Sequence, residues 1–296
     1  MNKKICALIT DRLIEEMEKG VIPWDKPWTG VGAVSHTTGK PYSLLNQLIL
    51  GCAGEWVTMN QIKAEKGHLK KGSKGSPVVF WKQVTTSLTD ENGEQTEKIV
   101  PMLRYYTVFN VEDCENIKVK YPPELQKHAN PVSEAEDIIT AYVEREGVKL
   151  IRDNLSDEAF YSPSRDAIVI PKIEQFPNEA LYYSTAFHEM AHSTGHKTRL
   201  DRFACGSGAA AFGSDDYSKE ELIAELGAAN LVAHVGIETK ASFRNSAAYL
   251  QSWMRVLKND PTMIISAAGK AEKAVNYILG DALCIPCLAI LYANRG

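Results

Sequence analysis

The spacing of apolar residues along the chain predicts blocks of helix and strand in both halves. Apolar side chains recur at helical spacing over residues 5–19, and Gly20 ends this stripe. The rest of the first half predicts short elements: helices over 42–51 and 56–67, and strands over 77–82 and 103–111 joined by a turn at 90–94. A polar, proline-bearing segment over residues 121–131 then interrupts the pattern and predicts a linker.

The second half is predicted to be mainly helical, with a small sheet. Its expected elements are a helix over 135–146, strands over 149–151, 159–161 and 167–170, a helix over 180–192 and three helices over 218–235, 246–258 and 261–279. The pattern therefore predicts an α+β protein with two domains, an α/β domain over residues 1–125 and a mainly helical domain over residues 132–296.

The composition is that of an ordinary globular protein. The chain has 296 residues, of which 44% are apolar and 24% charged, so each predicted domain can bury a core of its own. No apolar run reaches the roughly 18 residues of a membrane-spanning helix, and we expect no membrane partner. The basic N-terminus meets Asp11 too soon for the apolar core of a signal peptide. We therefore expect a cytoplasmic protein.

Charge divides unevenly between the halves. Residues 1–120 carry 16 Lys+Arg against 14 Asp+Glu, whereas the remaining residues carry 17 against 23. The imbalance is sharpest over residues 56–82, where six lysines accompany a single acidic residue, Glu65. This asymmetry predicts an anionic partner for the first half and none for the second.

The segment His188-Glu189-Met190-Ala191-His192 carries the strongest chemical signal. The eight residues before it contain no Gly or Pro, so the segment is expected on a helix, where two histidines four apart lie one turn apart on one face. Both imidazoles could then bind one Zn²⁺ or another divalent transition metal, and Glu189 could act as the general base that deprotonates water. A solvated helix with two chance histidines is the less favoured interpretation.

Two histidines require a further protein ligand to hold catalytic zinc. His196 lies after Gly195, where the helix should end, so we interpret it as a helix-end histidine near the last carbonyls. Glu221 and Glu225 share one face of a later helix whose small residues permit close approach. We expect Glu221 to be the ligand and Glu225 to support a ligand histidine, although the reverse assignment stays open.

Aromatic residues and lysines interleave in the first half. Lysine side chains bind phosphates and flat rings stack on unpaired bases, so such a surface suits single-stranded nucleic acid. The candidate contact residues are Trp24, Trp28, Tyr42, Trp81, Lys63, Lys70, Lys71 and Lys74, with Tyr105 and Tyr106 adding flat surfaces. The alternative is that the rings belong to the core and the lysines to an ordinary solvated surface. The residues alone favour neither.

Several segments in collinear order resemble one known family. In the first half they are Val21–Trp28, Gly39–Asn46, Trp56–Gln61, Gly72–Gly75, Val78–Trp81 and Tyr106–Val111, and they are similar to the ArdC-type N-terminal domain. In the second half they are Tyr161–Pro163, Asp166–Ile168, Phe187–His196, Arg199–Arg202 and Glu220–Glu225, and they resemble that family's zincin-like metallopeptidase domain. The family's usual Tyr-x-Gly-Ile-Asn is Tyr42-Ser43-Leu44-Leu45-Asn46 here, and Asn46 joins the candidate DNA contacts.

The resemblance implies an antirestriction protein of conjugative plasmids and other mobile elements. It implies that the first domain binds single-stranded DNA and that the second is a zinc metallopeptidase with a protein substrate. The rival hypothesis is a DNA-binding decoy without enzymatic activity, whose metal only braces the fold. Because a structural zinc normally has four protein ligands, a fourth ligand such as His196 would favour the decoy.

Overall fold

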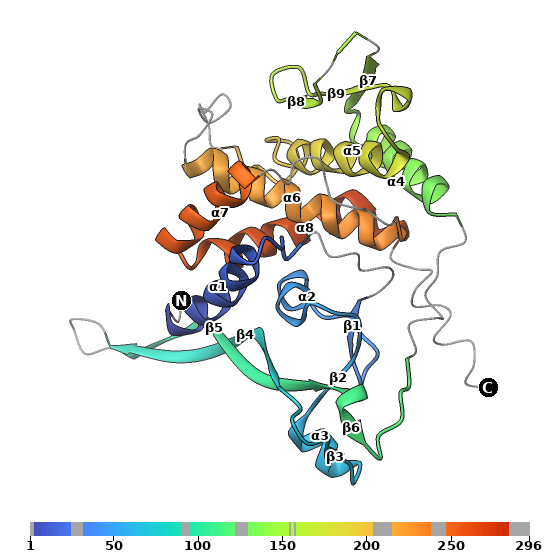
Figure 1. Ribbon diagram of the computed structural model, residues 1–296. Coiled ribbons are helices and arrows are strands. Elements are labelled where there is room, and N and C mark those ends of the chain that lie inside the picture. The colour runs from blue at the N-terminus through green and yellow to red at the C-terminus, as the bar shows by residue number, and fades with distance from the viewer. Residues whose placement is uncertain are drawn as a thin grey trace.

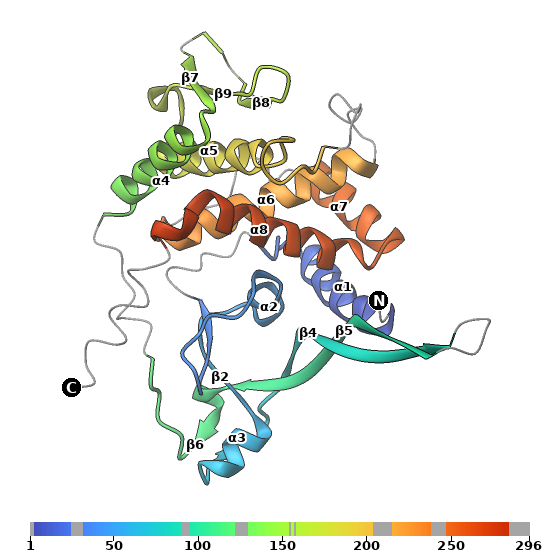
Figure 2. The same cartoon turned by 180° about the vertical axis from the view of Figure 1, so that it is seen from behind.

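The computed structural model describes residues 3–24, 32–89, 95–121, 130–153, 155–156, 158–203, 215–237 and 247–283. The molecule is arranged in tiers, which are visible from both sides (Figure 1 and Figure 2). A small sheet from the second half lies at one end, helices fill the middle, and the sheets of the first half lie at the other end. The mixture of helix and sheet confirms the predicted α+β class.

The first half builds a curved four-stranded sheet in the order β1-β2-β5-β4. Strands β1 and β2 are parallel, and the other neighbours are antiparallel. The strands are β1 (Ala33–Ser35), β2 (Gly54–Thr58), β4 (Ser76–Thr89) and β5 (Gln95–Asn110). Strands β4 and β5 form a long hairpin that extends sideways past the N-terminal helix (Figure 1 and Figure 2).

Short helices cover this sheet. The remaining elements of the first half are α1 (Lys3–Glu18), α2 (Leu44–Leu50), α3 (Met59–Ala64), β3 (His68–Leu69), the 3-10 turn η1 (Val111–Asp113) and β6 (Cys114–Glu115). Leu50 at the end of α2 packs with Val78 and Val108 of the hairpin, while Ile62 of α3 packs with Val57 of β2. Strands β3 and β6 pair as a separate two-stranded sheet.

The second half places a three-stranded sheet beside a layer of helices. Its elements are α4 (Pro131–Glu146), β7 (Lys149–Asp153), β8 (Phe160–Ser162), β9 (Ala167–Pro171), the 3-10 turn η3 (Ile173–Gln175), α5 (Glu179–Ser193), α6 (Asp215–Val235), α7 (Ala247–Asn259) and α8 (Met263–Leu283). The strand order is β7-β9-β8, with β7 parallel and β8 antiparallel to β9. Helix α5 lies between this sheet and α6 (Figure 1).

Most predicted elements are present, with one error. Residues 56–58 were expected to start a helix, but they end strand β2, because Trp56 and Val57 pair with Asn110 and Phe109 of β5. Thr58 is instead the N-cap of α3, where its side chain and that of Gln61 form a reciprocal capping box. The predicted turn at 90–94 and most of the predicted linker, residues 122–129, lie outside the described residues.

One hydrophobic core joins the two halves. Ile9 and Leu13 of α1 belong to the same buried cluster as Trp253 of α7 and Ile264 of α8. A partly buried hydrogen bond, from the Thr10 hydroxyl to the Pro261 carbonyl (2.8 Å), also crosses between the halves. Leu222 of α6 belongs to the same cluster, so helices α6, α7 and α8 pack directly on the first half. Among the described residues, no helix is both long and apolar enough to cross a membrane.

Candidate metal centre

Helix α5 presents the His-Glu-x-x-His segment from inside the protein. The Asn178 side chain caps the helix by accepting a hydrogen bond from the Leu181 backbone amide (2.9 Å). His188 and Glu189 are only 2% and 3% exposed, so their polar atoms face protein rather than bulk water. Burying ionisable side chains to this extent is costly unless they bind partners or a metal.

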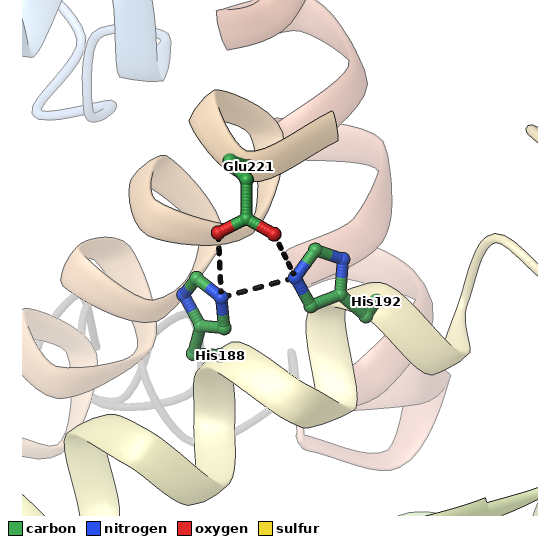
Figure 3. A group of neighbouring side chains, drawn as sticks. All are labelled: His188, His192 and Glu221. Carbon is green, nitrogen blue, oxygen red and sulfur yellow. Dashed lines mark hydrogen bonds and ion pairs between the residues drawn. The ribbon is translucent and has the colours of Figure 1, made fainter. Parts of the chain in front are cut away.

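The third residue of the cluster arrives because α5 and α6 approach closely. A Cβ atom added to Gly227 of α6 would lie 3.1 Å from the Cβ of Ala191 in α5. This small-residue contact brings Glu221 of α6 over the two histidines, and the three side chains point toward one another (Figure 3). The sequence predicted that small residues beside the acidic pair permit close packing of the helix, and the contact of Gly227 with Ala191 is of this kind.

The spacing of the three side chains suits a small divalent cation. The Nε2 atoms of His188 and His192 are 3.0 Å apart, and they lie 3.6 and 3.3 Å from the two carboxylate oxygens of Glu221. Tetrahedral zinc with bonds of about 2.0–2.2 Å separates its ligand atoms by about 3.3–3.6 Å. The two separations from Glu221 fall within that range and the one between the histidines is shorter, so the donor set fits a divalent ion with small adjustments. Within the described residues, this is the one cluster of three or more possible ligands.

Two further carboxylates approach the outer nitrogens of the same histidines. Glu225 Oε1 lies 3.5 Å from His188 Nδ1, and Glu220 Oε1 lies 3.5 Å from His192 Nδ1. His188 Nδ1 is buried and forms no hydrogen bond with any described residue, and the Glu225 carboxylate lies just beyond ordinary hydrogen-bond length from it. Carboxylates in this position orient a ligand imidazole and fix which nitrogen carries its proton.

The local charges are strongly coupled. Burial disfavours a charged imidazole, but hydrogen bonds to Glu220 and Glu221 outweigh it and raise the pKa of His192 to about 10. Burial likewise opposes ionisation of Glu221, yet the two histidines hold the pKa of that carboxyl well below its usual range. An ionised carboxylate therefore faces positive charge at this point, which is the electrostatic setting that a bound cation would also satisfy.

Arg202 holds Glu220 in place, a link that sequence reasoning missed. Its Nη2 and Nε atoms donate to the two oxygens of Glu220 at 2.6 and 3.2 Å. The same guanidinium donates to the Ala191 carbonyl (2.8 Å) and to the Thr194 hydroxyl (2.6 Å), so it ties α6 to the end of α5. Arg202 belongs to a segment that the family resemblance marked, but its contacts were not readable from spacing.

A second arginine fixes the turn after α5. The Arg199 guanidinium donates to both oxygens of Asp166 and to the Tyr161 hydroxyl (3.0 Å), while its Nε donates to the Ser193 carbonyl (2.7 Å). Burial opposes ionisation of Asp166, but Arg199 and Tyr161 outweigh it and lower the pKa of that carboxyl. His196, in the same turn, accepts or donates one hydrogen bond with the Thr198 hydroxyl (2.8 Å) and is not part of the cluster.

The candidate DNA contacts fall into two groups. Trp24 is 4% exposed and packs edge-on against Trp253, and Asn46 is 5% exposed and exchanges two hydrogen bonds of 2.8 Å with the Val79 backbone. Both side chains serve the core, which corrects the expectation that they present a surface to DNA. Tyr42 is partly buried, and burial together with the neighbouring Tyr106 hydroxyl raises the pKa of its own hydroxyl.

The lysines are exposed as expected. Lys63, Lys71 and Lys74 are exposed, and so is Lys70, whose ammonium also donates to the Glu112 carbonyl (2.7 Å). Trp28 and the side chain of Trp81 lie outside the part of the chain that the structure describes. The DNA-contact role of the lysines therefore remains a prediction.

A histidine pair on one helix, facing a glutamate on the next, defines a zincin-like metallopeptidase domain. Residues 136–270 match the family model for zincin-like metallopeptidases. Residues 3–109 match the model for the N-terminal domain of the anti-restriction factor ArdC. The chain belongs to the ArdC family of antirestriction proteins.

Solved structures agree over nearly the whole chain. The metal-free crystal structure of the antirestriction protein ArdC from plasmid R388 is 35% identical, with a TM-score of 0.70, and the match covers 92% of this chain and 96% of that one. A Mn(II)-bound structure of the same protein is 34% identical, with a TM-score of 0.71 and the same coverage.

Curated relatives include longer proteins. The chain is 36% identical to a DNA primase TraC of Escherichia coli over 92% of its own length, but it spans only 26% of that relative. A second TraC of the same species is 34% identical, and the chain spans 20% of it. An uncharacterised protein y4eC of Sinorhizobium fredii is 29% identical, and there the match covers 91% of this chain and 90% of the relative.

Proposed function

We propose that this protein is a metal-dependent peptidase that also binds single-stranded DNA and acts against restriction. The observation that carries the enzymatic part is the convergence of His188, His192 and Glu221 at separations suited to one divalent ion. The related ArdC structure with bound Mn(II) supports a divalent metal, and the donor set of two imidazoles and one carboxylate is one that Zn²⁺ uses in peptidases.

The residues have distinct roles in this proposal. His188, His192 and Glu221 hold the ion, which supplies a Lewis acid for the scissile carbonyl and lowers the pKa of water. Glu189, buried beside the first histidine, accepts the proton from the attacking water and delivers it to the leaving amine. Glu225 and Glu220 hold the two imidazoles in the orientation that keeps their Nε2 atoms directed at the ion.

The number of ligands distinguishes the peptidase from a decoy with a structural metal. A structural zinc is normally closed by four protein ligands, whereas a catalytic zinc keeps one position for water or substrate. Three possible ligands converge among the described residues, and His196 bonds to Thr198 instead. This count supports the enzyme over the decoy.

The first half is proposed to bind single-stranded DNA. The match of residues 3–109 to the ArdC N-terminal domain supports this part, together with the exposed lysines 63, 70, 71 and 74. Phosphate contacts from such lysines are sequence-independent and sensitive to salt. The cytoplasmic location and the protein substrate belong to the same proposal.

Substitution of the proposed base tests the enzymatic part. Glu189→Gln keeps the size of the side chain but removes its ability to accept a proton, so we expect peptidase activity on a denatured protein such as casein to fall at least 100-fold. Zinc binding, measured by isothermal titration calorimetry, and oligonucleotide binding should stay within about twofold of the wild type. Glu179→Gln, at the exposed start of the same helix, is the matched control. Turnover retained by Glu189→Gln would rule out the assigned base.

A further inference from the structure

The β4–β5 hairpin carries aromatic side chains on its surface. Ten large apolar residues are exposed in the described part of the chain, and three of the aromatic ones, Phe80, Tyr105 and Tyr106, lie on this hairpin. They are 40%, 54% and 39% exposed, although rings of this size are normally buried. Exposed apolar groups that gather in one place mark interaction sites more often than scattered ones do.

The strand register places two of these rings on one face. Phe80 pairs with Arg104 and Val78 pairs with Tyr106, and residues directly opposite each other in an antiparallel pair point to the same side. Side chains alternate along a strand, so Lys82 shares this face and Tyr105 lies on the opposite one. The face defined by Phe80, Lys82, Arg104 and Tyr106 is called the hairpin face below.

The hairpin face continues a buried surface but is itself uncovered. Val78 and Val108, on the same side of the sheet, are buried against Leu50 of α2. Beyond this contact the hairpin extends past the helices (Figure 1 and Figure 2), and the face becomes exposed at Phe80 and Lys82. The rings of Phe80 and Tyr106 are 5.3 Å apart at an interplanar angle of 55°.

The charge of the hairpin face is positive. Lys82 and Arg104 are exposed, and among the side chains that the structure describes no carboxylate forms an ion pair with either. Two neighbouring rings flanked by two cations provide stacking surfaces for bases and partners for the phosphates between them. A peptide strand would also find apolar surface here, but it would not use the flat ring faces and both cations together.

We propose that the hairpin face is the surface on which single-stranded DNA lies, with bases stacked on Phe80 and Tyr106 and phosphates bound by Lys82 and Arg104. This inference rests on the proposed DNA-binding function and adds the place at which the strand is held. The lysines 63, 70, 71 and 74, on and after α3, then contribute to the surrounding positive field rather than to base contacts.

Fluorescence anisotropy with the full-length protein and labelled oligo(dT) tests the proposal. An oligonucleotide of about 20 residues exceeds the roughly 4–16 nucleotides that one such surface covers. Phe80→Ala and Tyr106→Ala should each weaken binding about 5- to 100-fold. Lys82→Ala and Arg104→Ala should each reduce the slope of log affinity against log salt concentration by about 0.7.

Conservative and opposite-face variants separate stacking from other effects. Tyr106→Phe keeps the ring and loses only the hydroxyl, so it should bind like the wild type. Phe80→Leu keeps apolar bulk without a flat face and should bind as weakly as Phe80→Ala. Tyr105→Ala removes a more exposed ring from the other face and should change affinity less than about twofold. Thermal unfolding of each variant establishes that the fold is retained.

The outcomes distinguish this proposal from the one on which it rests. If the wild type does not bind oligo(dT), the proposed DNA-binding function is wrong, and the proposal for the hairpin face is rejected together with it. If the wild type binds but only Lys71→Ala and Lys74→Ala weaken the complex, the function stands and the hairpin face is rejected. Variants that raise the KM for casein without changing oligo(dT) affinity would also overturn the proposal, because they would assign the face to a protein substrate.

Discussion

The metal centre and the hairpin face differ in how their side chains are held. At the metal centre, the side chains are buried or partly buried and are fixed by partners from a second element, as when Arg202 binds Glu220 and two groups at the end of α5. On the hairpin face, the rings of Phe80 and Tyr106 lie 5.3 Å apart and remain 40% and 39% exposed. A small ion requires fixed donor positions, whereas a flexible strand needs only accessible rings and charges. At the metal centre, even a substitution of a supporting residue should therefore lower metal affinity. On the hairpin face, only the loss of a ring or a charge should lower DNA affinity.

The largest expected effect is a loss of zinc affinity that shows which of the two candidate glutamates is the ligand. Glu221 contacts both Nε2 atoms, so Glu221→Gln should lower zinc affinity at least 100-fold, because an amide oxygen is a weaker ligand than a carboxylate. Glu225 contacts only His188 Nδ1, and Glu225→Gln should cost about tenfold. Isothermal titration calorimetry measures both. A larger loss for Glu225→Gln would reverse the assignment.

The residues that the sequence singled out for a metal site converge in the structure because the determinants of each pair are local. The two histidines are four residues apart on one helix, and Glu221 and Glu225 are four apart on another, so helical geometry alone orders each pair. Which glutamate faces Nε2 and which faces Nδ1 depends on the contact of Gly227 with Ala191, a tertiary feature that no spacing encodes. Arg202 was missed for the same reason.

The first half was predicted less well because exposure there depends on distant partners. Trp24 was expected to be exposed, but Trp253, which belongs to the second half of the chain, packs against it. Asn46 resembled a DNA contact, but it bonds the Val79 backbone along the edge strand β4. Residues 56–58 were predicted to start a helix because the local sequence does not reveal that Trp56 pairs with Asn110 of a distant strand. Phe80 was overlooked, since only the register of β4 with β5 shows which rings share a face.

An intermediate effect is expected where a charge network supports the turn after α5. Asp166→Asn leaves the nearly inaccessible guanidinium of Arg199 without its anionic partner and should lower the free energy of unfolding by about 1.5–3 kcal/mol at pH 7. Because the pKa of Asp166 is lowered in the folded state, its ionised form stabilises the fold above the unfolded pKa of about 3.9. That stabilisation is lost as the pH falls through the folded-state pKa.

Urea unfolding of the wild type and Asp166→Asn at pH 7 and near pH 3 measures this difference. The gap between the two proteins should be widest at pH 7 and should narrow as the pH falls through the folded-state pKa of Asp166, below which the wild-type carboxyl also becomes neutral. Asp137→Asn, on helix α4, is a control without a resolved ion pair among the described residues. A gap that stays constant with pH would mean that Asp166 acts through its shape and not through its charge.

The smallest effect tests whether the metal centre depends on groups that never touch the ion. Arg202→Lys retains the positive charge but cannot hold both oxygens of Glu220 while also reaching Ala191 and Thr194. His192 should then lose part of its orientation, and zinc affinity should fall about tenfold with little change in oligo(dT) binding. Arg165→Lys, at an exposed turn of the second half, is the matched control. If Arg202→Lys binds zinc like the wild type, Glu220 does not position His192. Metal affinity would then depend only on the three converging side chains and on Glu225.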